Sequence, residues 1–210
     1  NEVYLGGESK VFGWTNIEST INSGNFSFDL NAEKIGSITF KEIRGIAYNG
    51  TYFAVADKSA ESIYIWEGVP STSDEPAYTL SGLINLGRID MNDDYLAIGC
   101  YPEGPSFKLL DLNNLQSPSF QTIPGQDCPS EMSLNELGLF MQTKNDDSII
   151  GWSSVAEALS GASYTMSFGG TTDKTNMGTR TASGIGWDGY HFWVGEFKFS
   201  NRLLGFAPSK

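Results

Sequence analysis

The sequence predicts an all-β protein built from a repeated unit of four short antiparallel strands. Segments of about five to eight residues rich in Ile, Val, Tyr, Phe and Trp recur along the chain, which is typical of strands. Asn-Gly, Asn-Asp-Asp and Asp-Gly separate consecutive segments, and these residues tolerate the backbone of tight turns. The same order of segments also returns, with matching positions at Gly45, Arg88, Glu131 and Gly184, which are 43, 43 and 53 residues apart.

Four strands in about 43 residues is the spacing of a β-propeller blade. A four-stranded sheet with two apolar faces cannot bury both by itself, and neighbouring blades cover them when sheets stack around an axis. The sequence therefore predicts a β-propeller with five recognisable blade repeats, forming a single domain over 1–210. The repeats are expected at approximately 1–40, 41–82, 83–125, 126–170 and 180–210.

Each complete repeat is expected to contain an inner strand, a second strand, a third strand and a weaker fourth strand. The inner strands read IRGIAYNG, GRIDMNDD, SEMSLNEL and SGIGWDG, and the second strands read VYLGG, YFAVAD, YLAIGC, LGLFMQ and HFWVGE. The third strands are expected within 10–17, 62–69, 107–115, 148–155 and 202–208, and the fourth strands read NFSFDL, AYTL, SFQTI and SYTMSF. Trp14, Trp66 and Trp152 recur at one position of the third strand, so we interpret them as packing residues. A short helix is expected only at 154–160.

The first repeat lacks its inner strand and the last repeat lacks its outer strand. Three arrangements are therefore open: five blades that close with an incomplete seam, a fragment of a six-bladed ring, or two chains that complete one another. Because the chain begins on a second strand with no preceding turn, we favour the fragment. Remaining blades or domains of a longer chain would then be partners.

One repeat carries a resemblance to a known family. The segment GIAYNGTYFAVADKSAESIYIW (Gly45–Trp66) resembles a blade of the NHL-type propellers and their relatives, with a Gly-containing turn, an apolar strand ending in V-A-D and a strand ending near an aromatic residue. The repeat at Arg88–Leu115 departs from this pattern, since Gly99 and Cys100 replace the A-D pair. The resemblance implies an architecture alone, because such propellers include both binding scaffolds and a few enzymes.

The composition limits the kinds of partner. The formal charge is −12, from 25 acids and 13 bases, and this field repels nucleic acid and anionic lipid. No apolar run approaches the ~20 residues of a membrane helix, so membrane insertion is not expected. Few Lys and Arg residues with many Ser, Thr, Asn and Gly residues favour an extracellular or cell-surface protein, and Asn25 and Asn49 begin glycosylation triplets.

The two cysteines are expected to form a disulfide. In a propeller, the loop between strands two and three opens on the same face as the loop that leads into the next inner strand. Cys100 ends a second strand, and Cys128 lies just before the next inner strand. The bridge would close a loop of about 28 residues, stabilise the fold by about 3–4 kcal/mol and imply an oxidising compartment. The alternative is a pair of unrelated buried thiols.

Charged residues recur where the inner strands begin. Arg44, Arg88, Glu131 and Arg180 occupy these places, and the arginines could form a funnel that binds the carboxylate or sulfate groups of a glycan. A blade-to-blade ion pair between Arg88 and Glu131 would explain them as well, and we favour this structural interpretation.

Aromatic and acidic residues near the ends of second strands have two interpretations each. Tyr101, Phe197 and Phe199 lie in loops between strands two and three, where they could stack on sugar rings, contact a protein or merely cap a blade. Asp57 and Glu196 end aligned second strands, and we expect them to accept hydrogen bonds from loop amides.

The residues needed for several kinds of catalysis are scarce. His191 is the only histidine and is expected inside an apolar second strand, where it would not serve a Ser-His-Asp triad. Zinc needs several His or Cys ligands, so we expect no metal site, and the chain shows no phosphate-binding or dinucleotide-binding motif that would indicate a cofactor. A glycosidase with paired carboxylates stays possible, although no pair of acids stands out.

The main hypothesis is therefore a non-catalytic extracellular or cell-surface β-propeller that binds a protein or glycan through one loop face. The first alternative is a propeller hydrolase acting on a carbohydrate or ester, with Arg44, Arg88 and Arg180 orienting the substrate. The second is a structural module of a larger surface assembly.

Overall fold

The computed structural model describes residues 3–14, 16–23, 30–100, 107–126, 129, 131–142, 148–169, 182–187, 191–196 and 203–206. The chain divides into two compact units, Asn1–Ile89 and Asp90–Lys210, and each unit is described by itself. The organisation of 1–210 as a single domain stays a prediction.

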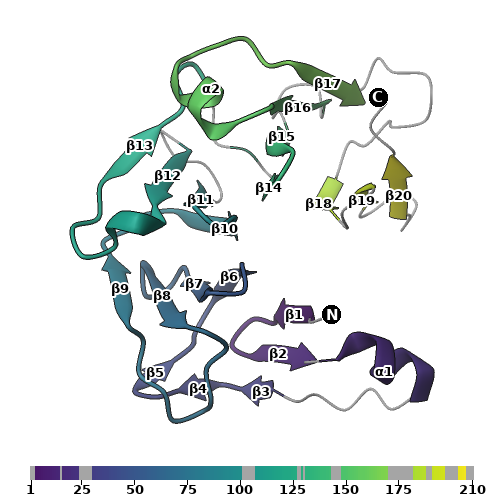
Figure 1. The fold of residues 1–210 in the computed structure, drawn as a ribbon. Coiled ribbons are helices and arrows are strands. Elements are labelled where there is room, and N and C mark those ends of the chain that lie inside the picture. Colours follow the sequence, from purple (N-terminus) through teal and green to yellow (C-terminus); the bar gives the residue numbers. More distant parts are fainter. Residues whose placement is uncertain are drawn as a thin grey trace. The chain divides into compact units, whose positions relative to one another are not determined.

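The first unit contains sheets that are antiparallel throughout (Figure 1). Its first sheet has the order β1-β2-β3, and its second has the order β6-β7-β8-β9. A short helix and a two-stranded hairpin, β4-β5, lie between them in the chain. The elements are β1 (Val3–Gly6), β2 (Val11–Trp14), α1 (Ile17–Ser23), β3 (Leu30–Ala32), β4 (Lys34–Ile35), β5 (Ile38–Thr39), β6 (Ile43–Tyr48), β7 (Tyr52–Asp57), β8 (Ser62–Glu67) and β9 (Tyr78–Ser81).

The second unit repeats the same arrangement with three further sheets (Figure 1). Their orders are β10-β11-β12-β13, β14-β15-β16-β17 and β18-β19-β20, and β10 begins in the last residues of the first unit. The elements are β10 (Leu86–Met91), β11 (Tyr95–Cys100), β12 (Lys108–Asp111), the 3-10 turn η1 (Leu112–Asn114), β13 (Phe120–Thr122), β14 (Met132–Asn135), β15 (Gly138–Gln142), β16 (Ser148–Trp152), α2 (Val155–Leu159), β17 (Met166–Gly169), β18 (Ala182–Trp187), β19 (Phe192–Glu196) and β20 (Leu203–Phe206).

The turns after the inner strands confirm the repeat alignment. In three sheets an asparagine side chain closes this turn: Asn49 Oδ1 accepts from the backbone N–H groups of Thr51 (2.9 Å) and Tyr52 (2.8 Å). Asn92 and Asn135, each 43 residues further on, accept in the same way from the residues that follow them. An asparagine side chain that accepts from the backbone of its own turn stabilises the tight turn locally. The recurring asparagine therefore marks the same turn in each of these three repeats.

Apolar side chains cover both faces of the sheet formed by β14–β17. One face packs on the sheet of β10–β13 through residues such as Leu134, Met141 and Trp152 against Ala97 and Leu109. The other face packs on the sheet of β18–β20, where the rings of Phe140 and Phe192 lie 4.3 Å apart. In the first unit the sheet of β1–β3 packs on the sheet of β6–β9 in the same manner. Stacked sheets that shield one another are the architecture that the sequence predicts.

Two of the three recurring tryptophans have the buried packing role that the sequence predicts, whereas Trp14 is only partly buried. Trp66 and Trp152 are buried, and the indole N–H of each donates to a backbone carbonyl in the loop that follows its strand. The acceptors are Asp74 O at 3.0 Å and Ala162 O at 2.8 Å. The same bond therefore fixes an equivalent outer loop in each unit.

A polar contact joins two inner strands of the second unit. Asp90 Oδ2, on β10, accepts from the backbone N–H of Leu134 on β14 at 2.8 Å. Asp90 Oδ1 accepts from the N–H of Met91 at 2.9 Å. The residue is half-buried, and burial of its carboxyl group raises the pKa to about 6. Asp90 is thus a titratable link between neighbouring sheets.

Two details differ from the sequence-based prediction. The helix α1 and the hairpin β4-β5 were not expected. Of the predicted fourth strand NFSFDL only Leu30 is described, as the first residue of β3, and residues 25–29 lie outside the described ones. The short helix α2 lies within the predicted range 154–160. Within the described residues, no helix has the length and apolar character to cross a membrane.

Candidate functional site

Three connections of the first unit form one surface, which we call the loop face. They are 40–42 before β6, 58–61 between β7 and β8, and 82–85 between β9 and β10. Backbone bonds join them: the N–H of Lys58 donates to Glu42 O at 2.9 Å, and the N–H of Leu83 donates to Glu61 O at 2.9 Å. The second bond confirms that a loop between strands two and three lies beside the segment leading into the next inner strand.

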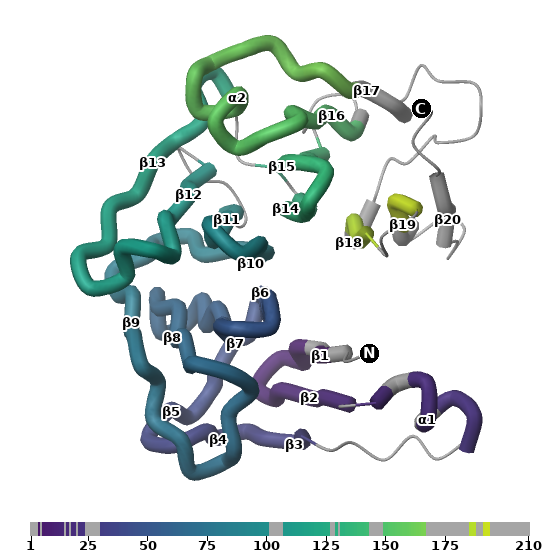
Figure 2. Tube along the Cα trace, viewed as in Figure 1, coloured from purple at the N-terminus to yellow at the C-terminus, as the bar shows by residue number. Residues whose placement is uncertain are grey.

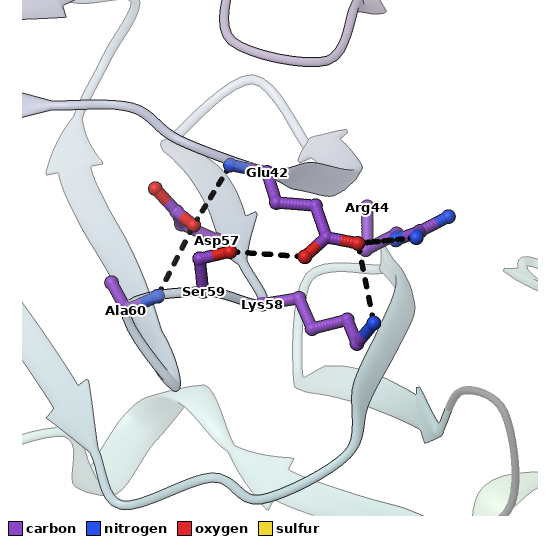
Figure 3. Close-up of polar contacts among 6 residues, drawn as sticks. All are labelled: Glu42, Arg44, Asp57, Lys58, Ser59 and Ala60. Atoms are coloured by element: carbon purple, nitrogen blue, oxygen red, sulfur yellow. Dashed lines mark hydrogen bonds and ion pairs between the residues drawn. The ribbon is translucent and has the colours of Figure 1, made fainter.

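Asp57 holds two loops of the loop face together through hydrogen bonds to their backbone. It is the last residue of β7 and is fully buried, with 0% of its surface exposed. Its carboxylate accepts from the backbone N–H of Lys41 at 2.8 Å. It also accepts from the N–H groups of Glu42 at 3.1 Å and Ala60 at 3.3 Å (Figure 3). The expectation that this acid accepts hydrogen bonds from loop amides is confirmed.

Glu42 accepts hydrogen bonds from three polar side chains near Asp57. Its Oε1 accepts from Nε and Nη2 of Arg44 and from Nζ of Lys58 at 3.2 Å, and its Oε2 accepts from the hydroxyl of Ser59 at 3.0 Å (Figure 3). The Arg44 hydrogen bonds, followed by those of Ser59 and Lys58, lower the pKa of Glu42 to about 2. The carboxylate therefore stays ionised at any neutral or mildly acidic pH. Its bonds to Lys58 and Ser59 link the connection 40–42 to the loop 58–61.

An apolar side chain projects from the loop face. Ile84 is 71% exposed, whereas its neighbour Leu83 is buried. Gly82 and Asn85 flank this pair with φ angles of +74° and +58°, and Glu61 on the bonded loop has a φ of +50°. Among the described residues, Glu61 and Asn85 are the residues other than glycine with positive φ. Such backbone strain is retained where the surrounding structure fixes it, and it gathers at functional sites.

The other predicted site residues lie on other elements or outside the described residues. Arg88 is exposed on β10 in the first unit. Glu131 precedes β14 in the second unit and is 5% exposed, with its carbonyl accepting from the N–H of Gln142 at 2.9 Å. The funnel of arginines and the Arg88–Glu131 ion pair stay predictions. The remaining predicted residues lie outside the described ones: Arg180, Tyr101, Phe197, Phe199 and Cys128.

The histidine was placed wrongly by the sequence analysis. His191 is exposed and precedes β19, which begins at Phe192, because the apolar alternation of that strand starts one residue later than predicted. Its ring lies 5.8 Å from the ring of Trp193. Among the described residues, no group of three or more His, Cys, Asp and Glu side chains is placed to hold a metal ion.

The sequence analysis missed most of the loop face. Glu42, Lys58 and Ile84 were not singled out, because their roles depend on contacts between loops. The one available signal was Ile84 itself, an apolar residue that follows Gly82 and precedes Asn85 in a turn segment.

Comparisons with known proteins address the fold. No protein-family model matches the sequence, and no curated protein resembles it significantly. The β-propeller domain of Cps50 (Swd1) from Myceliophteria thermophila is 10% identical, with a TM-score of 0.60 over 93% of this chain and 58% of that one. The WD40 β-propeller domain of Doa1 is 12% identical, with a TM-score of 0.58 over 97% and 59%.

A computationally designed protein, Ika4, is 6% identical, with a TM-score of 0.54 over 85% of this chain and 98% of that one. At such identities a likeness shows the fold alone: the chain is a β-propeller repeat protein. It spans a little under three fifths of the two natural structures. The repeat type named among them is WD40, and nothing in them supports the NHL type specifically.

Proposed function

We propose that the protein is a non-catalytic β-propeller that binds a partner protein through the loop face. The observation that carries this proposal is the exposed Ile84, held between two residues in left-handed conformation on a loop that is bonded to its neighbour. A large side chain on a loop whose backbone is already fixed requires little further ordering of the loop when a partner covers it, so more of its burial contributes to affinity. Analogy at the level of the fold agrees, since β-propellers typically mediate protein interactions.

A glycan is the alternative partner. Sugar rings stack on aromatic faces, and the loop aromatics that could provide them, Tyr101, Phe197 and Phe199, lie outside the described residues. The loop face offers an aliphatic side chain instead, which suits the apolar centre of a protein interface. We therefore favour a protein.

The proposal is tested with a displayed library of random peptides screened against the whole chain. We expect selected peptides to lose about tenfold or more in affinity for Ile84→Asp. The matched control is Ile21→Asp, because Ile21 is 62% exposed on α1 in the same unit, and this variant should bind like the parent. Peptides that bind Ile84→Asp unchanged, or binding confined to a glycan array, would contradict the proposal.

An extracellular or cell-surface location is part of the proposal, as is the NHL-like form of the repeats. The low content of Lys and Arg and the two glycosylation triplets support the location, and the segment Gly45–Trp66 supports the repeat type. The predicted disulfide would require an oxidising compartment.

The repeat alignment supports that disulfide. Cys100 is the last residue of β11 and corresponds to Gly7 in the first repeat, and Cys128 corresponds by position to Glu42. In the first unit the residues next to these two, Glu8 and Ile43, are joined by a backbone hydrogen bond of 2.8 Å. A bridge between Cys100 and Cys128 would use the same proximity.

We expect a thiol reagent to label the native oxidised chain only after reduction. Reduction should lower the melting temperature by about 6–12 °C, since a loss of about 3 kcal/mol acts on a chain of this size. The double variant Cys100→Ser, Cys128→Ser should melt like the reduced parent. Labelling of both thiols without reduction would rule the bridge out.

A further inference from the structure

The first unit contains a pocket of about 410 Å³ at the end of β8 opposite the loop face. The pocket is lined by Tyr4 from β1, Gly13 from β2, Leu30 from β3, and Val69 and Pro70, which follow β8. Ser71 and Thr72 form its rim. The volume lies in the range of small-molecule sites, which are mostly apolar with a few polar groups.

The aromatic wall of the pocket is fixed in place. The ring of Tyr4 packs edge-on against the rings of Phe53, at a centroid distance of 5.0 Å, and Tyr48, at 5.6 Å. Gly13 also lines the pocket, and a Cβ atom there would lie 2.6 Å from Cδ1 of Tyr4. Glycine at this position therefore leaves room for the ring.

The opposite wall, segment 69–74, is fixed by one internal bond and by bonds to two other segments. The N–H of Ser71 donates to Oδ2 of Asp74 at 2.8 Å, and this bond lowers the pKa of that carboxyl group. Asp74 O accepts from the indole of Trp66 at 3.0 Å. The N–H of Gly36 donates to Thr72 O at 3.0 Å. Segment 69–74 therefore presents a preformed surface, which reduces the loss of entropy on binding.

The hairpin β4-β5 is not part of the predicted four-strand blade, and it lies beside segment 69–74 (Figure 2). Besides the bond from Gly36, the hydroxyl of Ser37 donates to Oε2 of Glu75 at 2.5 Å. In the second unit Trp152 makes the same indole-to-loop bond as Trp66, with α2 in its loop and no such hairpin among the described residues. The hairpin thus supports the pocket wall, an addition that sheet stacking does not require.

The lining decides what the pocket can hold. None of its residues carries a charge, so an ionic ligand would lose its hydration without a partner. Apolar side chains and one aromatic ring fit a flat apolar ring, and the rim hydroxyls can bond one polar group. We propose that the pocket binds a neutral aromatic ring compound with a hydroxyl group, of the phenol class.

The test titrates the whole chain with p-cresol and follows backbone amide signals by NMR. We expect saturable shifts at Tyr4, Leu30 and Val69 with a dissociation constant of about 1 mM, as suits a ligand of this size. Benzoate, which has the same ring and a charge, should bind at least about tenfold more weakly.

Two variants of neighbouring exposed residues complete the design. Thr72→Phe places a ring in the pocket and should weaken p-cresol binding by about tenfold or more, and Ser73→Phe, one residue beyond the lining, should change it by less than about twofold. Thermal melting checks that both fold. Equal binding of benzoate, absence of shifts at the pocket, or unchanged p-cresol binding by folded Thr72→Phe would overturn the proposal. These outcomes are independent of the loop face.

Discussion

Replacement of Asp57 by alanine is expected to lower the free energy of unfolding by about 3–5 kcal/mol. The carboxylate is fully buried and satisfies three backbone N–H groups, those of Lys41, Glu42 and Ala60. Alanine leaves these groups without their acceptor beneath the loop face, and each unsatisfied buried group costs about 1–3 kcal/mol. Urea unfolding followed by fluorescence measures the change.

Two further variants sharpen this experiment. Asp57→Asn keeps one acceptor oxygen and should lose about half as much stability as the alanine variant. Asp93→Ala, at an exposed turn position, should change stability by less than about 0.5 kcal/mol. A parent-like stability of Asp57→Ala would mean that water or other groups replace the carboxylate. Folded Asp57 variants should also bind loop-face peptides more weakly, because the loops lose their common anchor.

Replacement of Asp90 by asparagine is expected to stabilise the protein at neutral pH by about 2–3 kcal/mol. Burial raises the pKa of Asp90 from 3.8 to about 6, against the opposing effect of the bonds from Leu134 and Met91. The unfolded chain therefore releases this proton at a lower pH than the folded one. The contribution of Asp90 to stability is fully present below about pH 4 and is lost as the pH rises through about 6.

Asparagine can still accept the N–H of Leu134 and has no charge to bury. Unfolding free energies measured from pH 4 to pH 8 should therefore nearly coincide for parent and Asp90→Asn near pH 4, diverge as the pH rises to about 6, and stay apart by a constant amount above that. Asp93→Asn serves as the exposed control and should follow the parent. Parallel curves for Asp90→Asn would show that the carboxyl group keeps its ordinary pKa.

The repeated part of the fold could be predicted from the sequence because each sheet meets the same neighbours. Asn49, Asn92 and Asn135 stand at one spacing since each closes an equivalent turn. Within the part of the chain that the structure describes, the hairpin β4-β5 and the helix α1 occur once, so no second copy revealed them. Both lie in the stretch where the sequence analysis expected a single strand.

The candidate site could be predicted only where one residue acts from a strand end. Asp57 was recognised in this way, because a lone acid after an apolar strand needs partners. The bonds of Glu42 to Arg44, Lys58 and Ser59 depend on two loops meeting, which no local pattern encodes. The burial of the Asp90 carboxyl group could not be predicted for the same reason. In LGRIDM, Asp90 stands between the apolar residues Ile89 and Met91. Its carboxyl group is contacted by Leu134 on β14, which lies far along the chain.

The two buried indoles, Trp66 in the first unit and Trp152 in the second, provide each unit with its own spectroscopic reporter. Both are anchored by the same kind of bond to a carbonyl in their own outer loop, so their magnetic environments change when that unit melts. A chain labelled with fluorotryptophan and assigned by single Trp-to-Phe variants would record the two melting events as two separate fluorine resonances. Coincident loss of both signals on heating would identify one cooperative transition, and staggered loss would rank the units by thermal resistance.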